Sequence, residues 1–333
     1  MAEPGTHHAD VASRSVRIPP EEDGGRVDEV LARLLGTSVR AAKRLCTEGL
    51  VRRGRTVVVK GDRVQAGQEL TILEPHVPSR ETPPLKLLVE TPRYLVMDKP
   101  AGMASHRLRP SDPPSALDVV VHRFPEVATA GPDPREGGLL HRLDVGTSGA
   151  LAFAREPRAF EAGRAAFKGG TARKLYLAMV HGEIAPVGVV EKPIAHHTGD
   201  PRQSVVVDGL RTHRGDPREA RTRWVTLARR GPDALVLVDA EGGRRHQVRV
   251  HLAHAGAPLW GDELYGGPPF RAHALPGHAL HAVWLSVPTA GETVIAQAAP
   301  PADWAPLVEE LLGRAGVEAL RRGGEAPLEL MER

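Results

Sequence analysis

Three polar clusters hold the residue types in this sequence that could carry out chemistry. The first is "HRLD" at 141–144, followed at once by the glycine-rich turn "GTSG" at 146–149. The second is "KLY", in which a single residue separates Lys174 from Tyr176. The third is "RRHQVRV" at 244–250. Taken singly, each cluster has a structural interpretation, since an aspartate before a turn often accepts turn hydrogen bonds and a tyrosine often lies in a core.

The third cluster has a period of two. Arg245 and Arg249 fall on one set of alternating positions, and His246 falls on the other. This alternation predicts a strand that sends Arg245 and Arg249 to one face and His246 to the opposite face.

Other catalytic classes fit the clusters poorly. The "GTSG" run lacks the G-x-S-x-G elbow of serine hydrolases. No phosphate loop or dinucleotide fingerprint is present. His246, His251 and His254 suggest a metal cluster, but arginines and not acids stand among them, so we expect no metal site.

Composition narrows the class of protein. Over 333 residues, 41% are hydrophobic and 26% charged, as in soluble globular proteins, and the length suits two domains. One cysteine, Cys46, excludes an internal disulfide and a cysteine-based zinc site. Without a membrane-length apolar run or an apolar leader, the sequence predicts a cytoplasmic protein with no membrane segment.

Positive charge is concentrated near the N-terminus. Residues 26–69 carry ten Lys and Arg against five Asp and Glu, a net +5, whereas the whole chain carries only +3. A small basic module is typical of nucleic-acid binding, and a solvated basic face is the alternative interpretation.

Hydrophobic spacing divides the chain into five parts. We expect a disordered tail at 1–15, then a small α+β domain at 16–74 with two short helices before glycine-punctuated strands. A proline-rich linker is expected at 75–85. Strand-like and helix-like runs then mix over 86–305, with several strands joined directly, which predicts an α+β fold with a mixed, largely antiparallel sheet flanked by helices. A C-terminal helix and tail would occupy 306–333.

The order of the motifs resembles the RluA-type family of RNA pseudouridine synthases. "HRLDVGTSGALAFAR" is similar to that family's H-R-L-D-x-x-T-S-G, and "KPAGMASH" at 99–106 to its K-P-x-G-x-x-x-H. "RKLYLAMVHG", "GRRHQVRVHLAHAGAPLWGDELYGG" and "LHAVWLSVP" match three further motifs in the same order. The resemblance covers about residues 86–305 and implies the pseudouridine synthase fold.

The resemblance implies an isomerase that turns uridine within RNA into pseudouridine without a cofactor. It assigns the catalytic carboxylate to Asp144, an ion pair with that carboxylate to Arg249, and a place beside the flipped uracil to Tyr176. Arg142 would occupy the space that the base leaves. Attack by the aspartate on ribose or base, and proton removal to give a glycal, both stay open. His141 is expected only to shape the loop.

The first domain resembles an S4-type RNA-binding domain, through "GGRVDEVLARLLG" and the strands after it. RNA contacts are expected from cations of both domains: Arg40, Lys43, Arg44, Arg52, Arg53, Arg142 and Arg245. Arg245 stands where the family usually has Thr or Ser, and we expect it to reach phosphate from the same strand face as Arg249.

The expected substrate is large-subunit ribosomal RNA, because S4-type domains are common among enzymes that act on it, and transfer RNA is the alternative. We expect a monomer. Two other hypotheses are a non-catalytic RNA-binding or ribosome-assembly factor on the same scaffold and a histidine metalloenzyme. The intact Asp144 speaks against the first, and the interleaved arginines speak against the second.

Overall fold

The computed structural model describes residues 13–47, 51–54, 56–73, 84–109, 112–133, 135–209, 213–270, 275–289 and 291–332. The chain divides into two compact units, one from residues 1–81 with 107–113 and the other from 82–106 with 114–333. Most of the predicted linker at 75–85 and of the predicted N-terminal tail lies outside the described residues. No described helix has both the length and the apolar character needed to cross a bilayer.

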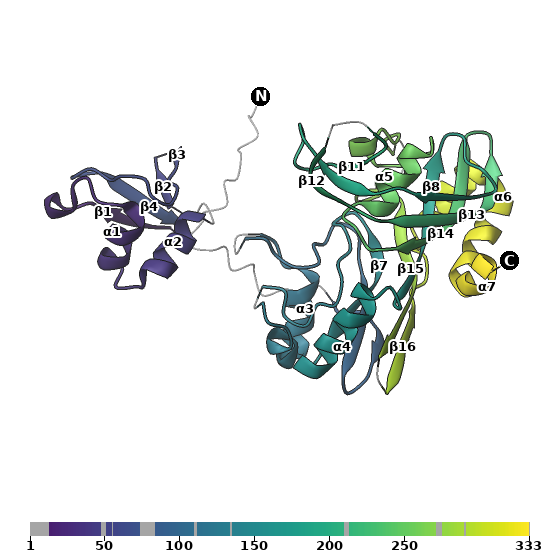
Figure 1. Cartoon of the computed structure of the whole chain (residues 1–333), viewed down its shortest axis with the longest axis horizontal. Coiled ribbons are helices and arrows are strands. Elements are labelled where there is room, and N and C mark those ends of the chain that lie inside the picture. The colour runs from purple at the N-terminus through teal and green to yellow at the C-terminus, as the bar shows by residue number, and fades with distance from the viewer. Residues whose placement is uncertain are drawn as a thin grey trace, which may run out of the picture. The chain divides into compact units, whose positions relative to one another are not determined.

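The first unit is a small α+β module (Figure 1). Its two predicted helices are present, and a four-stranded sheet with the order β1-β4-β2-β3 packs against them. The buried core includes Val30 and Leu31 of the first helix and Cys46 of the second. The elements are β1 (Ser13–Arg17), η1 (Pro20–Glu22), α1 (Val27–Leu34), α2 (Val39–Thr47), β2 (Val51–Arg53), β3 (Thr56–Val57) and β4 (Glu69–Leu73).

Strand β1 begins inside the segment that was predicted to be a disordered tail. It pairs antiparallel with β4, with Arg17 opposite Glu69. Its polar sequence hides it, because an edge strand is held by backbone hydrogen bonds to its neighbour and needs few apolar side chains. The predicted tail at 1–15 is therefore too long by the residues from Ser13 onward.

A nine-stranded mixed sheet forms the second unit, in the order β5-β6-β7-β15-β8-β14-β13-β9, with β16 paired to β15. Only the β7–β15 pair is parallel, so the sheet is largely antiparallel, as predicted. The strands are β5 (Leu87–Glu90), β6 (Tyr94–Lys99), β7 (Ser148–Ala154), β8 (Arg173–His181), β9 (Val187–Glu191), β13 (Arg221–Arg230), β14 (Asp233–Glu241), β15 (Leu280–Thr289) and β16 (Glu292–Gln297).

Strand β8 shows which helices cover each face of this sheet. Tyr176 and Ala178 belong to a core shared with α3 and α5, whereas Leu177 faces the opposite core, which α6 completes. Period-two alternation along the strand produces this division. The helices of the unit are α3 (Ala116–Arg123), η2 (Pro125–Thr129), α4 (Pro157–Lys168), α5 (Gln247–His254), η3 (Glu263–Tyr265), α6 (Trp304–Glu325) and α7 (Pro327–Glu332).

The C-terminal segment packs as part of the second unit and does not form a tail. Trp304, Leu320 and Met331 are buried against the sheet face that lies opposite Tyr176. The sequence pattern conceals this because α6 is kinked at Gly313, whose φ is 67°, and the kink breaks the helical period. Of the helix and tail predicted at 306–333, the helix is present as α6, whereas the tail is wrong for the described residues up to 332, which form α7.

A second, three-stranded sheet with the order β11-β10-β12 stands apart from the large one. Its strands are β10 (Ile194–His197), β11 (Ser204–Val206) and β12 (His213–Arg218). The turn that joins β10 to β11 comes close to the segment around α5, which Arg245 and Gln203 tie to it by hydrogen bonds.

Residues 247–254 form helix α5, where the alternating pattern predicts a strand. The alternation is misleading because six consecutive residues of this helix, 247–252, are buried. A helix that is buried nearly all round shows no one-sided apolar stripe. The Gln247 side chain anchors its start by donating to the carbonyls of Arg221 and Glu241.

Candidate active site

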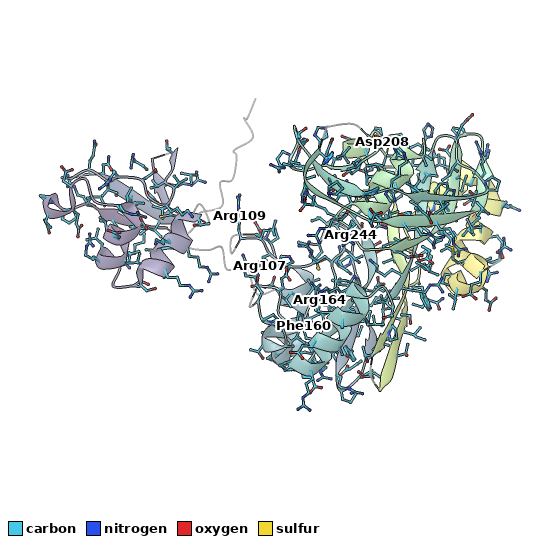
Figure 2. All side chains as sticks on the ribbon, viewed as in Figure 1. Arg107, Arg109, Phe160, Arg164, Asp208 and Arg244 are labelled. Atoms are coloured by element: carbon cyan, nitrogen blue, oxygen red, sulfur yellow. The ribbon has the colours of Figure 1, made fainter. Side chains whose placement is uncertain are left out.

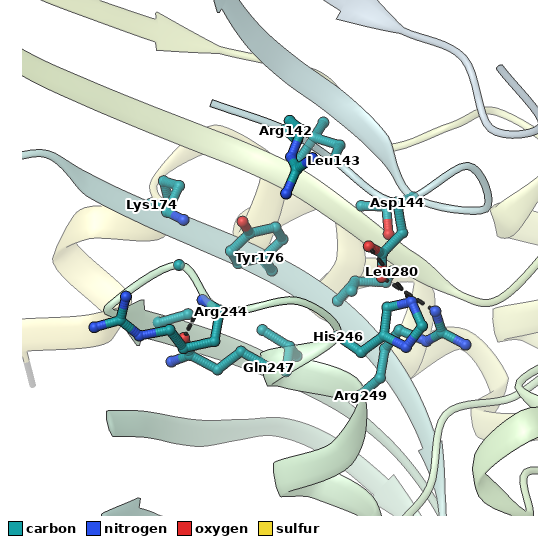
Figure 3. Close-up of a pocket in the computed structure, with 14 residues that line it drawn as sticks. Arg142, Leu143, Asp144, Lys174, Tyr176, Arg244, His246, Gln247, Arg249 and Leu280 are labelled. Atoms are coloured by element: carbon teal, nitrogen blue, oxygen red, sulfur yellow. Dashed lines mark hydrogen bonds and ion pairs between the residues drawn. The ribbon is translucent and has the colours of Figure 1, made fainter. Parts of the chain in front are cut away.

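A pocket opens on the α5 side of the large sheet, between the loop before β7 and the start of α5 (Figure 3). Its lining includes four cationic side chains and a single carboxylate, Asp144. The cations are Arg142, Lys174, Arg244 and Arg249. All three predicted catalytic residues, Asp144, Tyr176 and Arg249, line this one pocket, although they come from three separate parts of the chain.

Backbone contacts hold the loop that carries Asp144. On one side, the Ser105 hydroxyl accepts from the Leu143 N–H at 3.0 Å and donates to the Leu143 carbonyl at 2.8 Å. On the other side, the Val145 carbonyl accepts from the Gly102 N–H at 2.8 Å and lies 3.4 Å from the buried Lys99 ammonium. Residues of the "KPAGMASH" motif thus bracket Asp144.

The turn after Asp144 packs tightly against the segment 276–278. A Cβ on Gly146 would lie 2.9 Å from the His278 ring and 3.2 Å from the Cα of Gly277. The Thr147 hydroxyl meets His278 Nε2 at 2.8 Å. Because the Gly277 φ of 88° also favours glycine, the contact between these two loops needs a glycine on each side.

Arg249 connects Asp144 to a second carboxylate. Its Nη1 donates to Asp144 Oδ2 at 3.1 Å, while Nε and Nη2 donate to Asp262 at 2.7 and 2.8 Å. Bidentate pairing fixes the plane of a guanidinium, so Asp262 sets the direction from which Arg249 approaches Asp144. Oδ2 of Asp144 is engaged, and Oδ1 has no hydrogen bond among the described residues.

Asp144 is ionised at neutral pH. Burial raises its pKa, but interactions with His246, Arg249 and His278 outweigh burial and hold the pKa below the ordinary value of 3.8. Because burial lowers the pKa of His246 to about 4, that imidazole is neutral at pH 7, and Arg249 supplies the positive charge there. About a quarter of the Asp144 side chain is exposed, so the carboxylate can be reached from the pocket.

Tyr176 lies between Asp144 and two of the pocket's cations, Arg142 and Lys174 (Figure 3). In Figure 3 its hydroxyl points toward Arg142 and Lys174, and Asp144 lies on its other side. Burial, with a smaller effect from Asp144, raises the pKa of Tyr176, so the hydroxyl keeps its proton at neutral pH. Burial also lowers the pKa of Lys174 to about 8, against the opposing effect of Asp239.

Arg142 and Arg244 border the pocket, with the Arg142 side chain exposed and the Arg244 side chain half-buried. Figure 2 places Arg244 near the middle of the second unit, where it donates to the Glu219 carbonyl at 3.0 Å. Arg164 of α4, also labelled there, donates at 2.9 Å to the Leu140 carbonyl, just ahead of the loop that carries Arg142.

The strand pattern predicted that Arg245 would lie beside Arg249, but it does not. Since α5 begins at Gln247, Arg245 precedes the helix, and its guanidinium binds the carbonyls of Pro201 and Arg202 at 3.0 and 2.6 Å. It does not line the pocket. The expected position of Arg245, on one strand face with Arg249, is therefore wrong.

The remaining predicted RNA-binding cations belong to the first unit. Helix α2 exposes Arg40, Lys43 and Arg44, while Arg52 and Arg53 on β2 are half-buried. The buried Nε atoms of Arg52 and Arg53 have no hydrogen-bond partner in the part of the chain that the structure describes.

The other histidines of the motifs have structural surroundings. His141 is buried, and its Nε2 accepts from the Ala152 N–H at 3.2 Å. His251 contacts the Thr222 hydroxyl and the Lys192 carbonyl. Among the described residues, no group of three or more His, Cys, Asp or Glu side chains could hold a metal ion.

Four residues of the site were not assigned roles from the sequence, namely Lys174, His246, Asp262 and Tyr265. Lys174 and His246 stand inside quoted motifs, and Asp262 and Tyr265 belong to the "GDELYG" run. Their occurrence in the motifs that match the family was the only sign in the sequence that these four residues belong to the site. Their contacts depend on how α5, η3 and the loop before β7 meet, which no local pattern reveals.

Comparison with known proteins identifies the family to which this fold belongs. The family model described as RNA pseudouridylate synthase matches residues 93–254. An uncharacterized RNA pseudouridine synthase of Mycobacterium bovis is 35% identical over 83% of this chain and 88% of the relative. Ribosomal large subunit pseudouridine synthase D of Xanthomonas campestris is 30% identical over 93% of this chain and 96% of the relative.

A solved structure, human RNA pseudouridylate synthase domain containing 1, covers 72% of this chain and 95% of its own at 26% identity, with a TM-score of 0.54. The chain belongs to the RNA pseudouridine synthase family, whose members are isomerases. Within that family it is an RluA-type enzyme, and the resemblance seen in the ordered motifs is confirmed.

The packing of Gly146 predicts that Gly146→Ala moves the loop that carries Asp144. Because the new methyl group meets the His278 ring at 2.9 Å, we expect pseudouridine formation to fall on the order of 100-fold, the effect of displacing a reacting group by about 1 Å. Single-turnover rates measure this. Gly169→Ala is the control, since its methyl group meets only the Ala165 carbonyl, at 3.1 Å. Equal rates for the two variants would contradict the prediction.

Proposed function

We propose that this enzyme isomerises uridine to pseudouridine in large-subunit ribosomal RNA, with Asp144 as the catalytic carboxylate. The observation that carries the proposal is the single carboxylate of the pocket, which is ionised, partly exposed and paired through one oxygen with Arg249. The reaction breaks the bond between ribose and the base nitrogen and re-forms it at a base carbon. A carboxylate with one unoccupied oxygen suits each route that the sequence leaves open.

In this proposal, Tyr176 binds the uracil base of the flipped nucleotide. Its buried ring forms a wall of the pocket beside Asp144, and uracil stacks on such a ring. Because its hydroxyl keeps its proton at neutral pH, the tyrosine donates a hydrogen bond there and does not act as a phenolate base.

Arg142 stabilises the opened RNA. A uridine inside folded RNA must leave its stack to reach Asp144, at a cost of roughly a few kcal/mol. Arg142 is exposed at the border of the pocket, two residues before Asp144, so its planar guanidinium is placed to fill the gap and stack on the neighbouring bases. Lys174 and Arg244 add positive charge for the phosphates that flank the flipped nucleotide.

The first unit acts as the S4-type RNA-binding domain in this proposal. The exposed cations of α2 would hold phosphates without reading sequence. The choice of ribosomal RNA is supported by the relatives named ribosomal large subunit pseudouridine synthase D, which align over both units. Cytoplasmic action of a monomer completes the proposal.

Asp144→Asn tests the catalytic assignment, because it keeps the shape of the side chain and removes its charge. We expect it to abolish pseudouridine formation while RNA binding persists. Chemical mapping of pseudouridine in RNA incubated with purified protein measures the product. Asp303→Asn, on the exposed residue that precedes α6, is the matched control and should keep full activity. An active Asp144→Asn variant would refute the assignment.

The same mapping of RNA from cells with and without the gene tests the substrate. We expect one or more pseudouridines of the large-subunit ribosomal RNA to disappear without the gene. A loss confined to transfer RNA would contradict the proposed substrate while leaving the role of Asp144 intact.

The ion pair with Arg249 predicts how activity depends on pH. Arg249 helps to hold the pKa of Asp144 below its ordinary value, so activity that needs the carboxylate persists in the wild type as pH falls from 8 to about 5. Arg249→Gln removes the positive charge that opposes the effect of burial, so the pKa of Asp144 rises. The loss of activity on the acidic side should therefore begin at a higher pH than in the wild type. Single-turnover rates across pH test this, with Arg93→Gln as a surface control. Parallel profiles for Arg249→Gln and the wild type would contradict it.

Neutralising Arg40, Lys43 and Arg44 by alanine should weaken RNA binding and its dependence on salt. Each lost phosphate contact should reduce the slope of log affinity against log salt by about 0.7 to 0.9. Alanine at Arg314, Arg321 and Arg322 of α6 removes the same charge from the helix that covers the face opposite the pocket. Equal reductions in the two triple variants would argue against binding through α2.

A further inference from the structure

His246 has an unusual backbone for its residue type. Its φ of 57° makes it the only non-glycine residue with a left-handed backbone in the part of the chain that the structure describes. Such a conformation is uncommon and persists where surrounding contacts determine it. It occurs directly before α5, and the imidazole lines the pocket beside Asp144 (Figure 3).

A chain of hydrogen bonds bears on which nitrogen of His246 carries the proton. The Tyr265 hydroxyl oxygen accepts from the Ser204 N–H at 2.8 Å and lies 2.8 Å from His246 Nδ1. With the Ser204 N–H on that oxygen, we assign the hydroxyl proton to Nδ1, the acceptor that lies 2.8 Å away. The proton of the neutral imidazole is then on Nε2.

That Nε2–H faces the oxygen of Asp144 which Arg249 does not bind. Nε2 lies 3.9 Å from Oδ1, whereas Arg249 holds Oδ2 at 3.1 Å. A separation of 3.9 Å exceeds a hydrogen bond, but a side-chain shift of about 1 Å closes it, and catalytic hydrogen bonds commonly tighten when substrate binds.

The charged groups around His246 agree with a neutral ring. Burial, opposed in part by Asp144 and reinforced by the arginines, lowers the pKa of His246 to about 4. The titratable and charged groups that face the ring are Asp144, Arg245, Arg249, Asp262, Tyr265 and His278.

We propose that His246 is a positioning residue for Asp144, whose Nε2–H orients the reactive Oδ1 and whose tautomer is set by Tyr265. This inference rests on the proposed role of Asp144. Arg249 alone leaves the carboxylate able to rotate about its single contact. A second donor on Oδ1 restricts that rotation, so the oxygen that reacts is presented in one direction.

The β10–β11 turn completes this arrangement, and Arg245 holds the turn in place. Arg245 donates to the carbonyls of Pro201 and Arg202, and Gln203 Nε2 donates to the Leu264 carbonyl at 3.0 Å. These contacts place the Ser204 N–H against the Tyr265 hydroxyl. Arg245 thus acts on Asp144 through the turn, Tyr265 and His246, which gives this arginine a role other than RNA contact.

Two substitutions of His246 separate positioning from backbone structure. The amide nitrogen of Gln reproduces the position of Nε2, whereas that of Asn reproduces Nδ1. A left-handed backbone favours Asn over Gln. A purely structural role therefore predicts that His246→Asn is the more active and more stable variant. Positioning predicts the reverse order for activity, with kcat reduced about 10-fold in His246→Gln and on the order of 100-fold in His246→Asn.

These rates are measured by single turnover on RNA that the wild-type full-length chain modifies, and melting temperatures are recorded beside them. The expected order overturns the structural explanation, because the less stable variant is then the more active one. Activity of His246→Asn equal to or above that of His246→Gln overturns the proposal. Asp144→Asn is measured in the same assay to separate the positioning proposal from the proposed function. If Asp144→Asn is inactive, the proposed function stands even where His246→Asn is as active as His246→Gln.

Tyr265→Phe tests the hydrogen-bond chain while keeping the ring on which Arg249 stacks, 5.0 Å from its centroid. We expect kcat to fall about 10-fold, with KM within about 2-fold of wild type. Tyr94→Phe is the matched control, because it removes another tyrosine hydroxyl, which donates to the Ala159 carbonyl at 3.1 Å away from the pocket. Equal kcat values for the two variants would overturn the role of Tyr265.

Arg245→Thr introduces a residue usual in the family and releases the β10–β11 turn. We expect kcat to fall several-fold, in the same direction as Tyr265→Phe, and the double variant to be no slower than Tyr265→Phe alone. Arg229→Thr, which also removes an arginine bound to two carbonyls, those of Ile184 and Gly231, is the control. Effects of Arg245→Thr and Tyr265→Phe that multiply in the double variant would overturn the link.

Discussion

Sharing of one guanidinium between two carboxylates is the interaction on which the pocket depends. Arg249 gives two donors to Asp262 and a third to Asp144, and its face lies on the Tyr265 ring. Each of these groups is expensive to bury alone, and breaking a buried pair typically costs about 3–5 kcal/mol. Because Asp262 already satisfies Arg249 bidentately, Asp144 can keep one oxygen open without leaving the arginine unpaired. Asp144 is thereby anchored through Oδ2 and remains only partly neutralised.

Much of the catalytic unit could be predicted from the sequence, because the informative patterns are local. Strands β6, β7 and β8 are short apolar runs, and the helices α3 and α4 show the usual spacing. The convergence of Asp144, Tyr176 and Arg249 followed from ordered motifs and not from periodicity. Asp262 and Tyr265 stood in those motifs without a role, because only the packing of η3 against α5 shows what they contact.

The errors share a physical cause, which is that distant contacts override a local pattern. The alternating residues before and within α5 predict a strand, yet burial on nearly every side makes a helix of 247–254. That change of element moved Arg245 away from Arg249 and onto the β10–β11 turn. Strand β1 and the packed end of the C-terminal segment were missed for a similar reason, since pairing with β4 and packing against the sheet stabilise segments of unremarkable composition.

The single parallel pairing in the sheet, between β7 and β15, has a consequence for the order of assembly. Because the two strands are parallel, their first residues lie at the same end of the sheet. Ser148 therefore contacts His281, 133 residues later in the chain, and Thr147 contacts His278 beside them. The loop with Asp144 is therefore packed only after β15 has been synthesised. In a nascent chain on the ribosome, Asp144, Tyr176 and Arg249 are therefore all synthesised before the pocket that they line can form, because that pocket needs β15 to pack in place.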